Sequence, residues 1–263
     1  MNFLDCDIWC ICLKNREDRY KNSLIEFNKI GIAKKVKYYR PNKDSRGGRI
    51  GCWLSFIYCM EQSVKKNKSY MLIFEDDIKF TDNWKNEIHN IKIFLEFEPD
   101  WDVLRLGSYL TALEKPSIST KTIWKCRSIF NHAIIFNINF VKKLLKDRII
   151  YHPEKTIYHL DEYIEKDCTV NNFSLINQIC YQDLSLGTDN DWAKNNFILS
   201  KINFNNKIFY YITYINQFRN SIKWYLRFLP VEVQRNTDMT LIVIIVILII
   251  IVLLMKLVIA PHI

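Results

Sequence analysis

The sequence predicts an α/β fold with a mainly parallel central sheet, followed by a C-terminal transmembrane helix. The sheet is predicted because short, unbroken apolar runs alternate with stretches whose apolar residues recur at helical spacing. The membrane helix is predicted because residues 241–255 contain no polar side chain. Apolar residues make up 49% of the 263 residues, with only 6 glycines and 6 prolines, which excludes a disordered or collagen-like chain.

Four largely apolar runs are predicted to be strands, and the first, which is bounded by charge, is typical of a strand covered on both faces. They are Asp7–Leu13, Tyr70–Phe74, Asp102–Gly107 and His132–Phe136. Helices are predicted through Tyr20–Phe27 with a stop at Gly31, after Gly48, over 84–95 with Asp82 as the cap, and through Val141–Leu145. Ligands of such sheets bind beyond the carboxyl ends of the strands, so functional residues are expected there.

Three regions are predicted along the chain. Residues 1–200 form the globular domain, 201–238 a basic, aromatic segment, and 239–260 a span that reaches the ~20 residues a bilayer requires. Six of the nine surplus positive charges lie between Lys194 and Thr237, directly before the span. Since cationic flanks remain in the cytosol and the N-terminus lacks a basic signal region, we expect a single-pass C-terminal anchor with a cytosolic domain.

The basic, aromatic stretch 208–229 suits the surface of an anionic lipid bilayer. An alternative is a last core helix of the domain with one wet face. Because the surplus charge lies beside the membrane span, a nucleic-acid partner is not expected.

Cysteine spacing and two glycosylation sequons bear on the compartment. The eight cysteines match no zinc-binding spacing, and reduced core thiols are expected. The sequons begin at Asn67 and Asn172 and would be used only if the domain were luminal.

Three consecutive carboxylates, Glu75, Asp76 and Asp77, follow a predicted strand. They repel one another, so a cation is expected beside them. In an extended chain Glu75 and Asp77 would share a face, unless a turn has already begun. Two carboxylates with open positions suit Mg²⁺ or Mn²⁺ carrying a diphosphate, and these two are the predicted metal ligands. The alternative is a helix N-terminus or a turn whose acids stay solvated.

A second group, Lys14–Arg19, follows the first predicted strand. Arg16 and Arg19 would reach phosphate or uracil oxygens, or would be an ordinary solvated first helical turn. The sequence contains neither Gly-x-x-x-x-Gly-Lys-Ser/Thr nor Gly-x-Gly-x-x-Gly, so a P-loop or dinucleotide enzyme is not supported.

In order and spacing, several segments between residues 7 and 192 resemble glycosyltransferase family 25, which includes lipo-oligosaccharide and procollagen galactosyltransferases. The similar segments are Ile11–Arg19, Gly48–Ser55, Ile73–Phe80, Trp101–Gly107, Leu160–Tyr163 and Gln182–Asp189. One departure is plain: Phe56 stands where the family usually has histidine.

The resemblance implies a GT-A fold and inverting transfer of a hexose, galactose or glucose, from a UDP-sugar to a hydroxyl of a glycan, glycolipid or protein. It implies Mn²⁺ or Mg²⁺ held by Asp77, helped by Glu75 and Asp76. The departure at Phe56 favours an alternative, an inactive nucleotide-sugar or carbohydrate-binding protein of the same fold.

The resemblance also implies individual roles. Asp161 is the expected base, with Glu162 as second candidate, and Asp161 could instead cap a helix. The nucleotide-binding candidates are Leu13, Asn15, Arg16, Arg19, Ser55 and Asp76.

Overall fold

The computed structural model describes residues 6–166, 170–183 and 186–187. The chain divides into two units, Met1–Tyr214 and Ile215–Ile263, and all described residues lie in the first. The predicted basic segment and transmembrane helix therefore lie outside the described residues. Among the helices of the described ranges, none has both the length and the apolar character that crossing a membrane requires.

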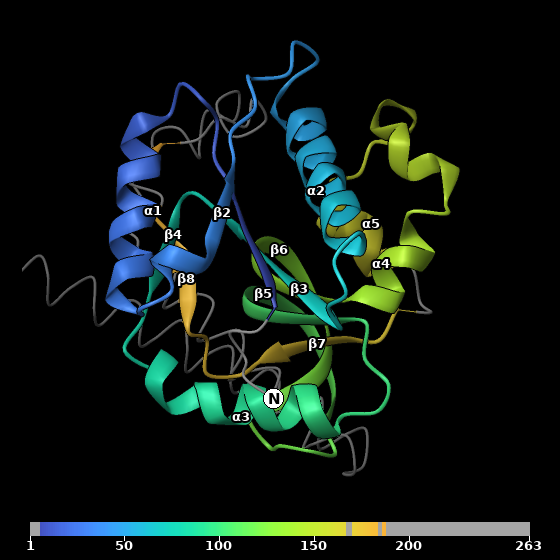
Figure 1. The fold of residues 1–263 in the computed structure, drawn as a ribbon. Helices are drawn as coiled ribbons and strands as arrows, with labels where there is room; N and C mark the ends of the chain where they lie inside the picture. The colour runs from blue at the N-terminus through green and yellow to red at the C-terminus, as the bar shows by residue number, and fades with distance from the viewer. Residues whose placement is uncertain (1–5, 167–169, 184–185, 188–263) are drawn as a thin grey trace, which may run out of the picture. The chain divides into compact units, whose positions relative to one another are not determined.

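The described strands form a six-stranded sheet in the order β2-β1-β3-β6-β5-β7 (Figure 1). Their bounds are β1 Asp7–Ile11, β2 Val36–Tyr39, β3 Tyr70–Glu75, β5 Val103–Pro116, β6 Ile123–Asn137 and β7 Asn172–Leu175. β1 is parallel to β2 and β3, β5 is parallel to β7, and β6 is antiparallel to β3 and β5. Within this sheet only β6 runs against the rest, so the predicted mainly parallel sheet is confirmed. A separate antiparallel pair joins β4, Ile78–Phe80, to β8, Cys180–Gln182.

Helices cover both faces of the sheet (Figure 1). They are α1 Glu17–Lys29, α2 Gly48–Val64, α3 Trp84–Phe97, α4 Ile138–Leu144 and α5 Leu160–Lys166, with short 3-10 helices at Ala33–Lys35 (η1), Arg148–Tyr151 (η2) and Pro153–Lys155 (η3). The first predicted helix ends as expected, because Gly31 adopts a positive φ of 76° that glycine accepts without steric cost.

Alternating residues of the central strands supply two hydrophobic cores. In β3, Leu72 and Phe74 pack with residues of α1 and α3, while Met71 and Ile73 pack with residues of α2, α4 and α5. Successive strand side chains point to opposite faces, so an unbroken apolar run buries both. This explains why β1 and β3 were recognisable as strands from the sequence.

Two details of the predicted elements differ from the structure. Helix α3 begins at Trp84 after Asn83, with no side-chain capping bond, so the prediction that Asp82 caps it is wrong. Asp82 lies in solvent, 4.0 Å from the Lys29 ammonium. The strands predicted at 102–107 and 132–136 belong to the longer β5 and β6, and the short strands β2, β4, β7 and β8 were not predicted.

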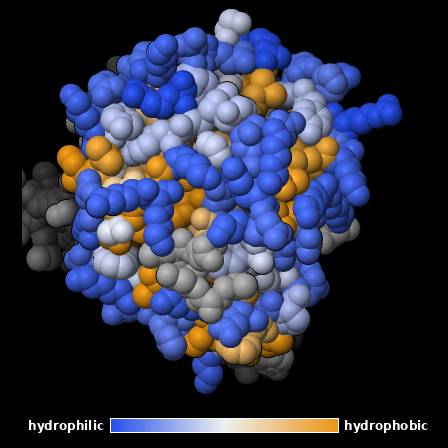
Figure 2. Space-filling model, in the orientation of Figure 1, coloured by the Kyte–Doolittle hydropathy of each residue, from blue (hydrophilic) through white to orange (hydrophobic). Residues whose placement is uncertain are grey.

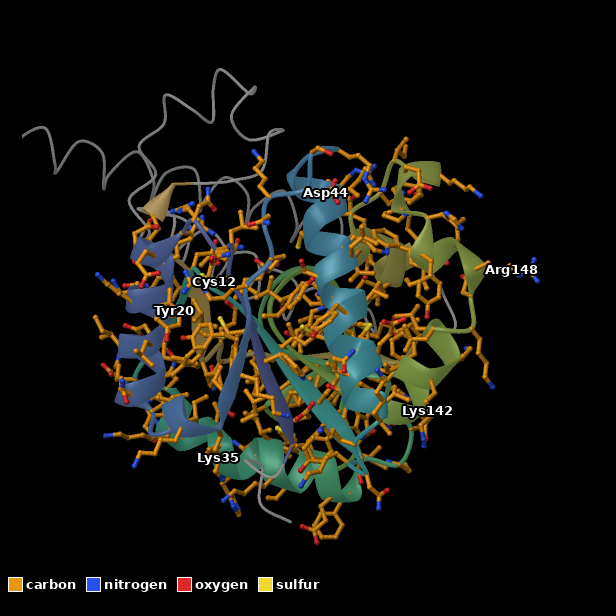
Figure 3. All side chains as sticks on the ribbon, turned by 45° about the horizontal axis from the view of Figure 1, so that its top comes forward. Cys12, Tyr20, Lys35, Asp44, Lys142 and Arg148 are labelled. Carbon is orange, nitrogen blue, oxygen red and sulfur yellow. The ribbon has the colours of Figure 1, made fainter. Side chains whose placement is uncertain are left out.

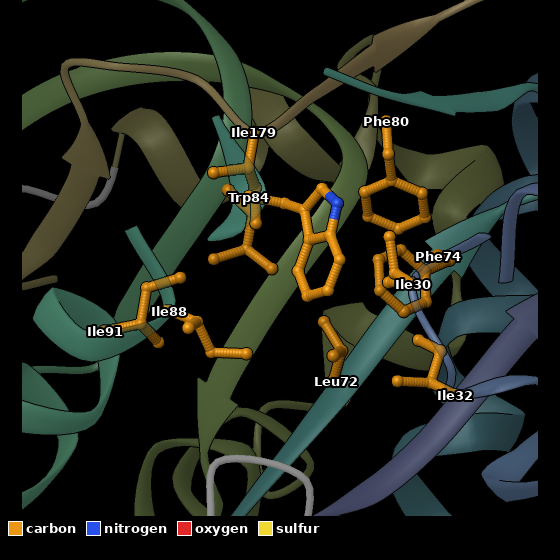
Figure 4. Close-up of a pocket in the computed structure, with 10 residues that line it drawn as sticks. Ile30, Ile32, Leu72, Phe74, Phe80, Trp84, Ile88, Ile91 and Ile179 are labelled. Atoms are coloured by element: carbon orange, nitrogen blue, oxygen red, sulfur yellow. The ribbon is translucent and has the colours of Figure 1, made fainter. Parts of the chain in front are cut away.

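A small apolar cavity of about 50 Å³ lies between the end of α1, helix α3 and the sheet (Figure 4). Its lining includes Leu72, Phe74, Trp84 and Ile88 and contains no charged side chain. Such a space offers nothing to a phosphate or a metal ion. The face drawn in Figure 2 is mainly hydrophilic, with apolar residues in separate small patches. Neither feature marks the candidate site.

Candidate functional site

The carboxyl ends of β1, β2 and β3 meet at one edge of the sheet, because Ile11 pairs with both Tyr39 and Glu75. Figure 3 shows which end this is. Lys35, just before β2, lies near one end of the described domain, and Asp44, after β2 in the loop that enters α2, lies near the other. Strand β3 ends at Glu75, and Asp76 and Asp77 form the turn into β4. The alternation that would put Glu75 and Asp77 on one face therefore stops at Glu75.

Arg19 is the cation that the three carboxylates require. Its Nη1 donates to Asp76 Oδ1 at 2.7 Å and lies 3.4 Å from Asp77 Oδ2, and its side chain is buried. Its Nη2 donates to the carbonyl of Gly187 at 2.6 Å. Although burial disfavours the charged guanidinium, the charges of Asp77 and Asp76 raise the Arg19 pKa overall. The sequence required a cation at this position without identifying it.

Asp77 has one buried oxygen that is not satisfied. The residue is 8% exposed, and Oδ1 has no hydrogen-bond partner among the described residues. Burial raises the Asp77 pKa to about 6, which Arg19 partly offsets and Asp76 reinforces. A buried carboxylate oxygen without a donor is costly unless a ligand completes it. Its hard oxygen fits Mg²⁺ or Mn²⁺, which often use one or two carboxylates and take the rest from water and phosphate.

Glu75 faces a different set of neighbours. Gln182 of β8 donates to Glu75 Oε2 at 3.0 Å, and the Cys52 thiol of α2 lies 3.8 Å from Oε1. Burial raises the Glu75 pKa to about 8, and the negative charges of Asp77 and Asp161 add to this. The charge of Asp161 of α5 therefore acts on the acidic triplet, although Asp161 is distant in sequence.

The two candidate bases on α5 have different surroundings. Glu162 Oε2 accepts from the backbone N–H of His159 at 2.9 Å, three residues earlier. This is the return bond of a capping box, so the capping function considered for Asp161 is performed by Glu162. Asp161 is half-buried, and its charge acts on Glu75 and Cys52.

The candidates after β1 are more exposed. Arg16 forms a two-point ion pair with Asp18, at 3.0 and 2.7 Å, and its Nη2 donates to the Leu186 carbonyl at 2.6 Å. Leu13 is half-buried and its carbonyl accepts from the Arg16 N–H, whereas Asn15 is exposed. These residues lie at the same sheet edge as the triplet.

Among the described residues, no hydrogen bond joins Ser55 to the acidic triplet. Ser55 is buried and its hydroxyl donates to the Gly51 carbonyl within α2, at 2.7 Å. Phe56 is fully buried in the core between α2 and the sheet. A benzyl side chain is well accommodated there, so the change from histidine is compatible with the fold.

Three residues at the site were not singled out from the sequence. Cys52 and Gln182 contact Glu75, and Arg49 donates to the carbonyls of Pro153 and Tyr158, just before α5. All three lie inside segments that carried the family resemblance, which was the available signal. Within the described ranges, no group of three or more His, Cys, Asp or Glu is arranged to hold a metal ion.

Comparison with known proteins finds a family whose model matches part of this chain. Residues 10–123 match the model of glycosyltransferase family 25, described as an LPS biosynthesis protein. A glycosyltransferase 25 family member of Aedes aegypti is 28% identical over 44% of this chain, and a probable inactive family member 3 of Bos taurus is 33% identical over 44%. The matches cover 19% and 20% of those proteins, so the chain spans about a fifth of the curated relatives it matches.

Among solved structures, a glycosyltransferase involved in the glycosylation of the major capsid of PBCV-1 aligns with 61% of this chain and 73% of its own, at 12% identity and a TM-score of 0.41. The family match includes Arg19, the Gly48–Ser55 block and the acidic triplet, and it ends before Asp161. The resemblance predicted from the sequence is therefore confirmed: over residues 10–123 this chain matches glycosyltransferase family 25.

Proposed function

We propose that this chain is a metal-dependent, inverting glycosyltransferase of the GT-A type that moves a hexose from a UDP-sugar to a hydroxyl group. The observation that carries the proposal is the buried Asp77 oxygen, which has no donor in the described part of the chain and lies beside Arg19, inside the segment that matches family 25. Buried carboxyl groups with raised pKa values at a sheet edge are typical of functional sites. The acceptor class is a glycan, glycolipid or protein.

Asp77 would hold Mn²⁺ or Mg²⁺, with Glu75 and Asp76 nearby. When bound, the ion supplies Lewis-acid stabilisation of the charge that develops on the diphosphate leaving group. Arg19 holds Asp76 and Asp77 in place, since its guanidinium contacts both carboxylates. Arg16, Leu13 and Asn15 are proposed to hold the nucleotide at the end of β1.

Asp161 is the proposed general base. Its carboxylate accepts the proton of the acceptor hydroxyl, whose oxygen then bonds to the sugar C1 as the bond from C1 to the diphosphate oxygen breaks. Attack from the face opposite the leaving group inverts the configuration at C1. Asp161 suits this role because its charge acts on Glu75 and because α5 is a segment separate from β1 and α1, which carry the nucleotide candidates.

A second candidate is a binding protein of the same fold without turnover. The 33% identity to a relative named as probably inactive favours it. Incubating the purified full chain in detergent with Mn²⁺ and a panel of nucleotide sugars separates the two. An enzyme releases UDP slowly from one UDP-hexose, and Asp161→Asn loses that release while retaining Mn²⁺–UDP binding. Binding of UDP without hydrolysis of any sugar would establish the second candidate.

We also propose that residues 239–260 anchor the chain with the domain in the cytosol, supported by the cationic flank before the span. The structure sharpens the glycosylation test. Asn172 is buried and bonds to Ser128, whereas Asn67 is exposed after α2. Expression with glycosylation-competent microsomes should give no mass increase. A mass increase that Asn67→Gln removes would show a luminal domain.

A further inference from the structure

The first turns of α2 contact both halves of the candidate site. Arg49 Nη1 donates to the carbonyls of Pro153 and Tyr158, at 3.0 and 2.9 Å, in the segment that leads into α5. Cys52, three residues later, places its thiol 3.8 Å from Glu75. Residues three apart on a helix lie on neighbouring parts of one face. One face of α2 therefore touches the metal side through Cys52 and the acceptor side through Arg49.

The segment held by Arg49 consists of the 3-10 helix η3 and a connection with an exposed Ile157 that leads into α5. Helix η3 packs on α2 and η2. A charged donor shared by two carbonyls fixes both in direction as well as in distance. Tyr158 is three residues before Asp161, so a shift of its carbonyl moves the first turn of α5.

We propose that Arg49 is a positioning residue, which sets the separation between the Asp161 carboxylate and the acidic triplet by holding the entry to α5 against α2. The inference rests on the proposed function, in which Asp161 is the base. Displacing a catalytic group by about 1 Å can cost about 10²-fold in rate, so a residue that touches no substrate can still control turnover.

Three variants test this in the full-length protein. Arg49→Met removes both bonds and keeps an unbranched side chain, while Arg49→Lys keeps a cationic donor. Lys29→Met is the matched control, because Lys29 also donates from a helix to a backbone carbonyl, that of Phe80 at 2.9 Å, far from α5. Arg49→Met should lower kcat for UDP-hexose hydrolysis about 10- to 100-fold. The Kd for Mn²⁺–UDP should stay within about twofold, since the contacts to the triplet are unchanged. Arg49→Lys should recover most of the rate.

A readout independent of activity separates failure of this inference from failure of the proposed function. Hydrogen exchange of backbone amides 158–164 should accelerate in Arg49→Met and not in Lys29→Met. In Arg49→Met, the exchange of β4 and β8 should be unchanged. Normal protection of 158–164 in Arg49→Met overturns the inference, whether or not the wild type hydrolyses a sugar nucleotide. The inference is also overturned if Lys29→Met lowers kcat as much as Arg49→Met does at an equal loss of thermal stability. If the wild type hydrolyses no sugar nucleotide but amides 158–164 exchange faster in Arg49→Met, the proposed function fails. The positioning role of Arg49 then stands.

Discussion

Two buried carboxylate clusters lie at opposite ends of the parallel strands, and they differ in how completely they are satisfied. At the start of β1, Asp7 pairs with Lys37 and accepts from Trp9 Nε1 and Ser63 Oγ, each at 2.8 Å. At the carboxyl end, Asp76 and Asp77 share Arg19, and no residue that the structure describes donates to Asp77 Oδ1.

The pKa directions follow this difference. Burial alone raises the pKa of both groups, but at Asp7 the bonds from Lys37, Ser63 and Trp9 outweigh it and the pKa falls below 3.8. At Asp77 burial dominates and the pKa rises to about 6. A cluster whose carboxylate has all its donors stabilises the fold. Burial of a carboxylate that lacks a donor remains unfavourable until a cation binds.

The largest expected effect is at the incomplete cluster. Asp77→Asn should lower Mn²⁺-dependent hydrolysis of UDP-hexose by about 10²-fold or more, because a neutral amide is a weak ligand for a hard cation. Mn²⁺ with UDP at 100 times Kd should stabilise the wild type by about 2.7 kcal/mol, which raises its Tm. Asp77→Asn should abolish this rise in Tm. Asp82→Asn, which removes an exposed carboxylate, is the control. Wild-type turnover in Asp77→Asn would exclude the metal role.

The complete cluster should respond in the opposite way. Asp7→Asn should destabilise the domain by about 2–3 kcal/mol, because Lys37, Trp9 and Ser63 all lose a charged acceptor. Tm should fall by about 5–10 °C in thermal unfolding followed by tryptophan fluorescence. Hydrolysis at 25 °C should be unchanged, and a selective loss of turnover without a change in Tm would contradict the contrast.

The pH dependence sharpens the same contrast. The Asp7 pKa is lower in the folded than in the unfolded state, so its stabilisation is complete well above 3.8 and is lost as pH falls through the folded pKa. The difference in Tm between wild type and Asp7→Asn should therefore be full at pH 7 and shrink below about pH 4. A difference that stays constant to pH 3 would show that packing, not charge, is responsible.

The smallest expected effect is on the metal-free protein. Asp77→Asn removes a buried charge with an unsatisfied oxygen. In EDTA at pH 7 we therefore expect the free energy of unfolding to increase by less than about 1 kcal/mol, which raises Tm by about 1–3 °C. The gain is small because Arg19 loses one of its two ionic partners. A large drop in Tm would mean that the carboxylate is structural, like Asp7.

Much of the architecture was predictable because β1, β3 and the helices α1 to α4 carry their own periodicity. The strands that were missed, β2, β4, β7 and β8, have three or four residues and exist through partners elsewhere, as when Ile78 pairs with Gln182. Local pattern contains no information about such pairing.

The candidate site was predictable to a similar extent. The triplet was found because its charges follow an apolar strand. The direction of each carboxylate depended on a turn at Asp76, and the capping role of Glu162 on the exact start of α5. Sequence pattern placed these residues near the right sheet edge but could not assign their hydrogen bonds.

The position of β6 limits how the family-matching segment can be handled. That segment ends at residue 123, where β6 begins, yet β6 lies between β3 and β5, both of which belong to the segment. A fragment cut at this boundary would leave two strands with open edges and no central neighbour. Grafting residues 10–123 onto another protein therefore requires a host strand of reversed direction, and chimaeras should be joined beyond β8 instead.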